Sequence, residues 1–382
     1  MQTATTTHLA GQGWTQPLPT ALDSAQTLVL AFGSSQLAAD APALRALVEA
    51  FPKAVVLGCS TAGEIAGPEV NDDSLSVAVT RFDHTRLALA VAEVTQAAQS
   101  GTAGAQLAQQ LRAGGEDLCA VFMLSDGLSV NGTPLVQALA QGLDAGVAIS
   151  GGLAGDGSAF QRTWVLAGGR ARPGCVAAVG LYGTRLQVGS GCQGGWMDFG
   201  PERSITRSEG NVLYELDGKP ALDLYKSYLG ELAQGLPGSA LRFPLSIRRP
   251  GSDAPPLVRT ILAIDEAARS LTFAGDMPQG HAARLMRTTN DSLIDSAAQA
   301  SAAALAGASG SGDALVVSVS CVGRRLVLGE RTEEEVESVL EAAPPGTGHV
   351  GFYSYGEISP GPAGGASDLH NQTMTVTVFS ER

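Results

Sequence analysis

The hydrophobic positions of this chain fall into apolar runs typical of β-strands, and three of those runs end in the same kind of turn. They read VVLGCSTAGEI from Val55, VAISGGLAGD from Val147 and VGFYSYGEI from Val350. Each run leads through small residues to an acidic side chain and closes a strand–helix–strand pattern. The chain therefore uses one structural unit three times.

Each unit is expected to begin with an apolar strand and to continue through an amphipathic helix. The opening strands start at Leu28, Leu118 and Ala314, and the helices are expected over residues 43–51, 134–143 and 333–341. In the first and third units an alternating strand follows, over residues 74–82 and 372–379. The matched spacing predicts that Gly63 and Glu64 superimpose on Gly356 and Glu357.

Near Arg207 the sequence changes from a glycine-rich strand, through a polar segment, to a strand, a turn and a helix, and we place a domain boundary there. Beyond it we expect a helix from about Pro220, strands over 245–249, 257–265 and 270–276, a helix over 289–305 and a linker over 307–313. Strands interleaved with helices predict an α/β or α+β fold with mixed sheets and pseudo-repeated units. The expected division is an N-terminal extension over 1–24, a first domain over 25–207 and a second over 208–382.

Composition indicates a globular protein placed in the cytoplasm. The chain has 382 residues, of which 44% are hydrophobic, enough to bury large cores. No apolar run approaches the roughly 20 residues that span a bilayer, and the opening lacks the basic and apolar parts of a signal peptide. Its cysteines are five in number and lack C-x-x-C spacing, so we expect reduced, structural thiols: Cys59, Cys119, Cys175, Cys192 and Cys321.

A formal charge of −13 opposes binding to nucleic acid, which needs a clustered basic face. The arginines between residues 242 and 287 are a local exception. They can mark a docking surface for an acidic protein, but a solvated face is the favoured interpretation.

The repeated turn has two chemical interpretations. Glycine reaches positive φ angles cheaply and lets backbone amides approach a ligand. An acidic residue after that glycine, as in Glu64 and Glu357, can accept hydrogen bonds from a ligand amine. It can equally be a structural carboxylate that binds neighbouring backbone amides, and both interpretations stay open.

The remaining motifs give weaker evidence about function. Gly189, Gly191 and Gly194 satisfy G-x-G-x-x-G, but no helix is expected to begin there, so a dinucleotide site is rejected. GCSTAG resembles a nucleophile elbow in which Ala62 replaces the second glycine, which leaves a hydrolase or transferase using Cys59 or Ser60 as an alternative. The histidines show no metal-ligand spacing.

Seven ordered motifs resemble the FIST family, named for F-box and intracellular signal transduction proteins. They are GCSTAGEI, SDG (from Ser125), SGGLAGDG (from Ser150), LDGKPALDLY (from Leu216), CVGRRLVLG (from Cys321), GFYSYGEISP (from Gly351) and LHNQTMT (from Leu369). The resemblance covers roughly residues 28–379. It implies a sensory input module whose ligand is a small molecule, either an amino acid or, in one branch, haem with nitric oxide.

The resemblance also implies a partner. Family members occur beside or fused to chemoreceptors, histidine kinases and cyclic-di-GMP enzymes. Because this chain has no room for a transmitter domain, we expect it to act in trans on a separate histidine kinase, diguanylate cyclase or phosphodiesterase. Its leading residues supply no F-box, and neither membrane insertion nor catalysis is expected.

The candidate ligand-binding residues lie at the strand-end turns and in the C-terminal motifs. They are Cys59, Ser60, Thr61, Gly63, Glu64, Gly152, Asp156, Arg324, Tyr353, Tyr355, Glu357, His370 and Asn371. Arg324 is expected to grip a carboxylate, the glutamates to accept from an amine, and the two tyrosines, which share a strand face, to line the pocket together or not at all. His370 is the expected axial ligand only if haem is bound. Otherwise His370 and Asn371 are expected to support the turn that carries Glu357. A scaffold without a small ligand, whose halves leave no cleft between them, remains an alternative.

Overall fold

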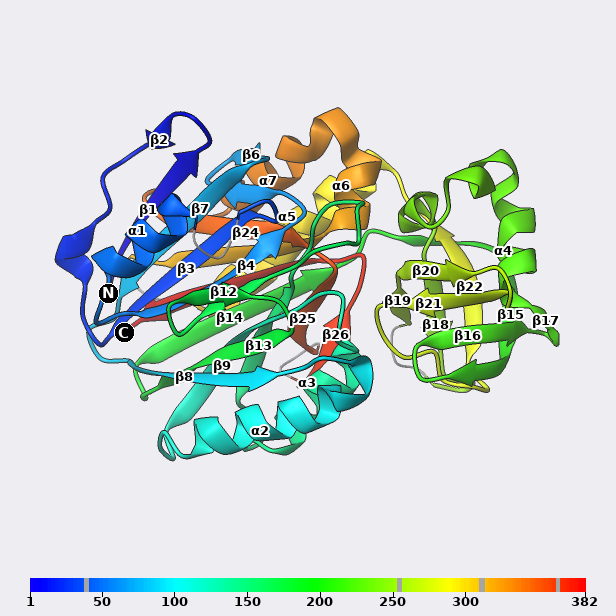
Figure 1. Cartoon of the computed structure of the whole chain (residues 1–382), viewed down its shortest axis with the longest axis horizontal. Coiled ribbons are helices and arrows are strands. Elements are labelled where there is room, and N and C mark those ends of the chain that lie inside the picture. The colour runs from blue at the N-terminus through cyan, green and yellow to red at the C-terminus, as the bar shows by residue number, and fades with distance from the viewer. Residues whose placement is uncertain (38–40, 253–255, 309–312, 362–364) are drawn as a thin grey trace.

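Three β-sheets form the larger part of the molecule, here called the body, and each is built on one of the three repeated units (Figure 1). The computed structural model describes residues 1–37, 41–252, 256–308, 313–361 and 365–382. Every unit pairs two parallel strands with an antiparallel third on the other side of the first strand. The triplets are β3 (Thr27–Ser34), β4 (Val55–Thr61) and β7 (Ser74–Arg81); β9 (Leu118–Ser125), β10 (Ala148–Leu153) and β13 (Cys175–Tyr182); β23 (Leu315–Cys321), β24 (Gly348–Ser354) and β27 (Met374–Glu381).

The three units exchange strands in a cycle. The strand after the first turn, β5 (Glu64–Ala66), pairs with β24 in the third sheet. The strand after the third turn, β25 (Gly356–Gly361), pairs with β10 in the second sheet. The segment after the second turn supplies β11 (Val165–Ala167), which pairs with β4 in the first sheet. Each sheet is therefore completed by a neighbouring unit, which brings the three turns together.

Edge strands complete the three sheets of the body. The first sheet adds β1 (Gln2–Leu9), β2 (Gly13–Trp14) and β12 (Arg170–Arg172). The second adds β8 (Arg86–Glu93) and β26 (Gly365–His370), and the third adds β6 (Glu69–Asn71) and β14 (Leu186–Gln193). Residues 1–24, expected to be an extension, thus contribute a strand paired with β7 along its whole length.

The inner faces of the three sheets share one core. Phe32, Phe122 and Phe352 come from the first, second and third sheets and are completely buried in it. The rings of Phe32 and Phe352 stack with centroids 4.7 Å apart. Burying a side chain of this size stabilises the fold by roughly 1.5–3 kcal/mol, so this core fixes the three units against one another.

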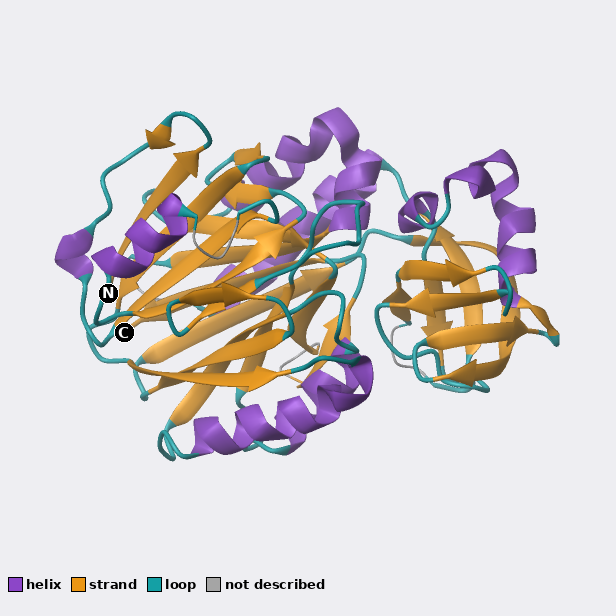
Figure 2. Cartoon of the chain, viewed as in Figure 1, coloured by secondary structure: helices purple, strands orange, loops and turns teal. Residues whose placement is uncertain are grey.

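Helices cover the outer faces of the sheets (Figure 2). The first sheet is covered by α1 (Pro42–Ala50), and the second by α2 (Ser100–Arg112) and α3 (Gly132–Gln141). The third is covered by α5 (Asn290–Gly307) and α7 (Thr332–Glu341). Short 3-10 helices are η1 (Thr20–Leu22), η2 (Ala97–Gln99) and η5 (Gly329–Arg331). The expected helices of all three units are confirmed, and so is the mixed α/β class with repeated units.

Two glycines of the G-x-G-x-x-G motif serve helix packing. A Cβ at Gly189 would lie 1.8 Å from the carbonyl oxygen of Ala304, and one at Gly191 would lie 1.9 Å from that of Ala300. These positions of β14 must be glycine because α5 lies directly against the strand. The motif therefore has a structural explanation.

A small sheet with its own core forms the rest of the molecule, to the right in Figure 1. Its strands are β15 (Met197–Glu209), β16 (Val212–Leu216), β17 (Lys219–Pro220), β18 (Leu245–Arg248), β19 (Leu257–Arg259), β20 (Ile261–Asp265), β21 (Ser270–Phe273) and β22 (Ala282–Arg287). Helix α4 (Ala221–Leu229) and the 3-10 helices η3 (Gly230–Gly235) and η4 (Gly238–Arg242) accompany it. The expected boundary near Arg207 falls within β15, and the chain returns from β22 to the body through α5. Of the expected linker over 307–313, residues 309–312 lie outside the described residues.

One helix near the repeated turns was not expected from the sequence. Immediately after β23 the chain forms α6 (Val322–Leu328), within the motif CVGRRLVLG, for which no helix is expected from the sequence. Helix α6 contacts η4 of the small sheet, so it lies where the two parts of the molecule meet. In the described parts of the chain, no helix has the length and apolar character needed to cross a membrane.

Candidate functional site

The three repeated turns meet in a ring of backbone hydrogen bonds. In each bond an amide that follows one parallel strand donates to a carbonyl of the next unit. The bonds run from Ala62 to Tyr353 (2.8 Å), from Tyr355 to Leu153 (3.2 Å) and from Gly155 to Ser60 (3.0 Å). The sequence motif singled out first is therefore a real spatial cluster. Its centre is tightly packed, since a Cβ at Gly155 would lie 3.2 Å from Cβ of Ala62.

Glu64 is a buried carboxylate held by the protein itself. It accepts hydrogen bonds from the Thr61 hydroxyl and, at 3.0 and 2.9 Å, from the amide and hydroxyl of Ser74. Burial outweighs these bonds and raises the pKa of Glu64 from its ordinary value of 4.5 to about 7. Thr61 and Glu64 thus complete the first turn, and the structural interpretation of this carboxylate holds.

Glu357 has the same surroundings in the third unit. It accepts from the Ser354 hydroxyl (2.6 Å) and from the amide and hydroxyl of Thr373 (3.1 and 2.9 Å). Burial raises the pKa of Glu357 to about 8. The expected equivalence of the two glutamates is found in their hydrogen bonds.

Asp156 follows the second turn and supports a loop. It accepts from the amides of Phe160, Gln161 and Arg162 at 2.7–2.9 Å and from the hydroxyl of Tyr355. The ring of Phe160 stacks on that of Tyr355 with centroids 4.8 Å apart. This carboxylate is therefore occupied by its own loop.

Arg324 does not face an open site, which corrects its expected role. Its side chain is completely buried and forms an ion pair with the equally buried Glu335 at 2.6 Å. Its remaining donors bind the carbonyls of Gly194 (2.5 Å) and Leu293 (2.9 Å) and the Ser296 hydroxyl (3.2 Å). Each of its three nitrogens has a protein partner and the side chain is completely buried, so the guanidinium is not presented to a ligand in the groove.

The two tyrosines are both buried and bind protein groups. The hydroxyl of Tyr353 donates to Glu335 at 2.8 Å, and that of Tyr355 donates to Asp156 and to the carbonyl of Gly157. Neither lines the groove described below. They behave alike, but not through a shared strand face, because β24 ends at Ser354 and Tyr355 lies in the turn after it. Gly152 also lies in the interior, because a Cβ added at this position would lie 2.7 Å from Cγ1 of Val319.

Cys59 and Ser60 lie at the end of β4 and are completely buried. Ser60 Oγ accepts from the amide of Trp164 at 3.0 Å, and no acid or base of the described chain is hydrogen-bonded to it. Burial, and then the charge of Glu64, raise the pKa of the Cys59 thiol well above its ordinary value. Neither side chain has the partner that an activated nucleophile needs. All five cysteines are free thiols.

His370 and Asn371 support the third turn. His370 pairs with Glu357 across β25 and β26, and Asn371 Nδ2 lies 3.5 Å from the carbonyl of Tyr355. Nε2 of His370 is buried and has no hydrogen-bond partner among the described residues, and desolvation lowers the pKa of the imidazole. The imidazole does not line the groove described below. One nitrogen is thus available, but the surroundings do not fit a haem group.

An open groove of ≈ 590 Å³ lies beside the ring of turns. Its volume falls in the range of small-molecule sites. It runs along α6 between the β5–β6 hairpin, the loop after β10 and η4 of the small sheet. Its lining residues are Ala62, Val70, Gly157, Ser158, Arg242, Val322, Arg325, Leu326, Gly329, Glu330, Thr332 and Glu333.

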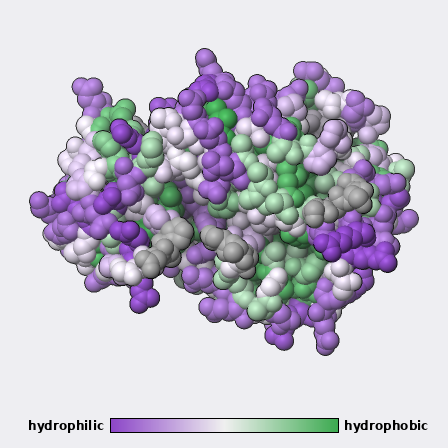
Figure 3. All heavy atoms as spheres, turned by 180° about the vertical axis from the view of Figure 1, so that it is seen from behind, coloured by the Kyte–Doolittle hydropathy of each residue, from purple (hydrophilic) through white to green (hydrophobic). Residues whose placement is uncertain are grey.

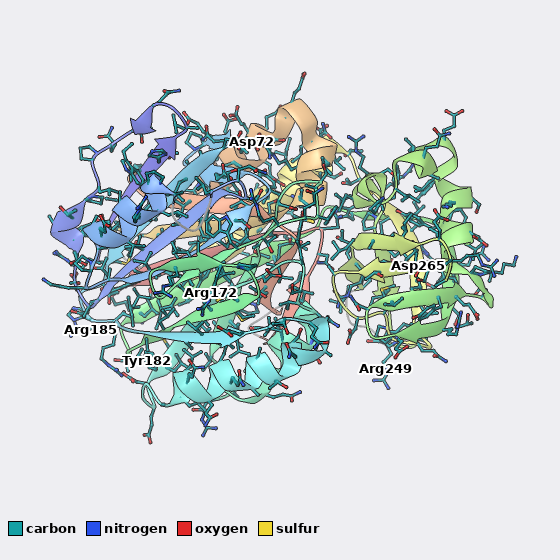
Figure 4. All side chains as sticks on the ribbon, in the orientation of Figure 1. Asp72, Arg172, Tyr182, Arg185, Arg249 and Asp265 are labelled. Carbon is teal, nitrogen blue, oxygen red and sulfur yellow. The ribbon has the colours of Figure 1, made fainter. Side chains whose placement is uncertain are left out.

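Arg325 ties α6 to the first turn at the wall of this groove. Its guanidinium donates to the carbonyl of Ala62 and, through two nitrogens at 2.8 Å each, to Asp72. Asp72 is labelled near the top of Figure 4. Hydrogen bonds from Arg325 hold the pKa of Asp72 below its ordinary value. A Cβ at Gly63, which has a φ of +136°, would lie 2.6 Å from Nη1 of Arg325, so this approach requires glycine.

Three further charged residues of the groove are not committed to protein partners. Within the described parts of the chain, the side chains of Arg242, Glu330 and Glu333 form no ion pair and no hydrogen bond, and all three are exposed. Charges of both signs are therefore available to a ligand. Of the expected site residues none lines the groove; the sequence located the neighbouring turns and missed the groove itself.

Comparison with known families agrees with this architecture. The model of the FIST N domain matches residues 27–219, and that of the FIST C domain matches residues 221–360. The chain therefore belongs to the FIST family, whose domains are sensory domains of signal transduction.

Comparison with individual proteins adds little. No curated protein shows significant sequence similarity to the chain. A crystal structure of cyanuric acid hydrolase from A. caulinodans is similar over 96% of this chain and 92% of its own, with 9% identity and a TM-score of 0.34. A similarity this low supports no inference about function.

Proposed function

We propose that this protein is a cytoplasmic, non-catalytic sensor that binds a small molecule in the groove along α6. The observation that carries the proposal is the combination of volume and uncommitted charge of both signs beside the ring of turns. An amino acid is the ligand class that such a lining suits best, because its carboxylate and its ammonium each find an opposite charge.

Three alternatives are less well supported. A hydrolase or transferase needs a base that is free to act on Cys59 or Ser60, whereas Glu64, the carboxylate whose charge acts on Cys59, is held by Thr61 and Ser74, and in the described chain no acid or base is hydrogen-bonded to Ser60. A scaffold without a ligand would be favoured by a filled cleft between the parts of the molecule, whereas this groove is open to solvent. Haem with nitric oxide rests on the free nitrogen of His370 alone.

The signal passes to a separate protein in this proposal. The sensory family suggests a histidine kinase or a cyclic-di-GMP enzyme as the partner, acted on in trans. Nucleic acid is disfavoured by the formal charge of −13. Seen from behind, most of the visible hydrophobic surface lies over the body (Figure 3), which makes the body the first surface to examine for partner contacts. The measurement is kinase autophosphorylation or cyclic-di-GMP turnover with and without the liganded sensor.

Thermal shift and calorimetry against the twenty amino acids test the ligand. A ligand at about 100 times its Kd stabilises the native state by about 2.7 kcal/mol. Ser158→Trp should abolish the effect by filling the groove, because Ser158 is exposed and lines it. Ala159→Trp is the matched control, since Ala159 is exposed in the same loop and does not line the groove. Failure of every amino acid to stabilise the wild type would refute the amino-acid proposal.

A further inference from the structure

The two parts of the molecule contribute opposite charges to the groove. Among the described residues, Arg242 is the one lining residue that comes from the small sheet, at the end of η4. Glu330 and Glu333 come from the body, in η5 and α7. A ligand that contacts both sets therefore spans the junction between body and small sheet.

Arg242 is the cation of the groove that remains free for a ligand. The other lining arginine, Arg325, is bound through both terminal nitrogens to Asp72 and through one of them to Ala62. Arg242 is exposed, and no ion pair joins it to Glu330 or Glu333 within the described chain. A guanidinium in this state can form two parallel hydrogen bonds to a carboxylate.

The position of Arg242 is fixed although its side chain is free. The preceding residue, Leu241, is completely buried, and its carbonyl accepts a hydrogen bond from Gln372 Nε2 at 2.8 Å. The carbonyl of Gln372 in turn accepts from Trp196 Nε1 at 2.8 Å. Arg242 thus combines a fixed backbone with a guanidinium that has no protein partner among the described residues. This arrangement suits a binding residue, because the backbone loses little conformational entropy when a ligand binds.

The uncharged residues of the lining indicate the chemical character of the ligand's side chain. The lining also includes the aliphatic side chains of Val70, Val322 and Leu326 and the methyl group of Ala62. Val70 and Leu326 pack on the buried core of the body, so they present a fixed apolar wall. Among the described residues, no aromatic ring belongs to the lining.

We infer that Arg242 binds the carboxylate of an aliphatic α-amino acid whose ammonium lies toward Glu330 and Glu333. This inference rests on the proposed function and adds its specificity: the ligand is selected by the two charged groups on its Cα and by an apolar wall for its side chain. It also makes the ligand a link between the small sheet and the body.

The probes are L-leucine, L-leucinamide, which lacks the carboxylate charge, and 4-methylpentanoate, which lacks the ammonium. Calorimetry with the full chain should rank L-leucine above both analogues. Arg242→Ala should weaken L-leucine roughly 10- to 100-fold, the value of a charged hydrogen-bonded contact, and should leave L-leucinamide unchanged. Glu330→Gln combined with Glu333→Gln should weaken L-leucine and leave 4-methylpentanoate unchanged.

Arg249→Ala is the control, because Arg249 is an exposed arginine of the small sheet outside the groove. It should not change any of the three affinities. Equal binding of L-leucine by the wild type and Arg242→Ala would overturn the inference while the proposed function stands. Binding of other amino acids but not of L-leucine would overturn the aliphatic class. Absence of binding by every amino acid would instead remove the proposed function, and this inference with it.

Discussion

Glu64 and Glu357 are buried in equivalent surroundings in two different units. Each accepts one hydrogen bond from the hydroxyl residue that ends its parallel strand. Each also accepts two bonds from one residue at the start of the antiparallel strand, Ser74 for the first and Thr373 for the second. The first and third units therefore share a buried polar contact as well as the same course of the chain. This contact joins each turn to its sheet.

The stability of the protein should fall as the pH rises from about 7 to 8, above the range in which the buried imidazoles of His349 and His370, whose pKa values are lowered by desolvation, act in the opposite direction. The pKa values of Glu64 and Glu357 are raised to about 7 and about 8 from an ordinary 4.5. The native state therefore keeps protons that the unfolded state has released. This contribution to stability is complete below pH 4.5 and is lost as the pH rises through 7 and 8, by up to about 1.4 kcal/mol per pH unit and group.

Denaturant unfolding at several pH values measures this slope. Glu64→Gln and Glu357→Gln should each flatten it, and the double variant should flatten it most. Glu69→Gln, at an exposed position of the same hairpin, is the control and should leave it unchanged. A wild-type stability that is constant or increasing between pH 7 and 8 would contradict the prediction.

Gly63→Ala should destabilise the protein more than Gly67→Ala. Gly63 has a φ of +136°, and a Cβ there would lie 2.6 Å from the Arg325 guanidinium. Gly67 has a φ of +61° with nothing within 4 Å, so it tests the backbone term alone. We expect a loss of about 1 kcal/mol for Gly67→Ala and roughly 2–3 kcal/mol for Gly63→Ala. Equal midpoints in urea would show that the contact with Arg325 contributes nothing.

Glu335→Ala should cost about 3–5 kcal/mol, because it leaves the Arg324 guanidinium buried without its carboxylate. The double variant Arg324→Met with Glu335→Leu should recover much of this loss. Glu334→Ala breaks the exposed pair with Arg331 and should cost much less than Glu335→Ala, because solvent screens that pair. Chemical unfolding of the four proteins is the measurement, and a loss for Glu335→Ala no larger than that for Glu334→Ala would refute the assignment.

The purified protein mixed with haem should develop no specific Soret band. His370 offers a free nitrogen, but it lies outside the groove and pairs with the strand that carries Glu357. Absorbance titration of wild type and His370→Ala is the test. A Soret band in the wild type that disappears in His370→Ala would reverse this expectation and make His370 an axial ligand.

The sequence by itself determined the repeated unit and its chemistry. The apolar strands, the helices and the turns ending at Glu64 and Glu357 can be predicted because hydrophobic periodicity and glycine are local signals. The ordered motifs also indicated the family. The buried partners of those turns could not be predicted, since Ser74 and Thr373 reach them only through sheet pairing.

Only the tertiary structure decided which residues face a ligand. Arg324 and Arg325 are neighbouring arginines, yet the side chain of Arg324 forms a buried ion pair and that of Arg325 lines the groove. The direction of a helix face decides between them, and the hydrophobic pattern does not predict α6. Arg242 reaches the same groove from the small sheet, far away along the chain. Packing between distant segments sets such positions, because burial and ion pairing depend on neighbours that no local pattern encodes.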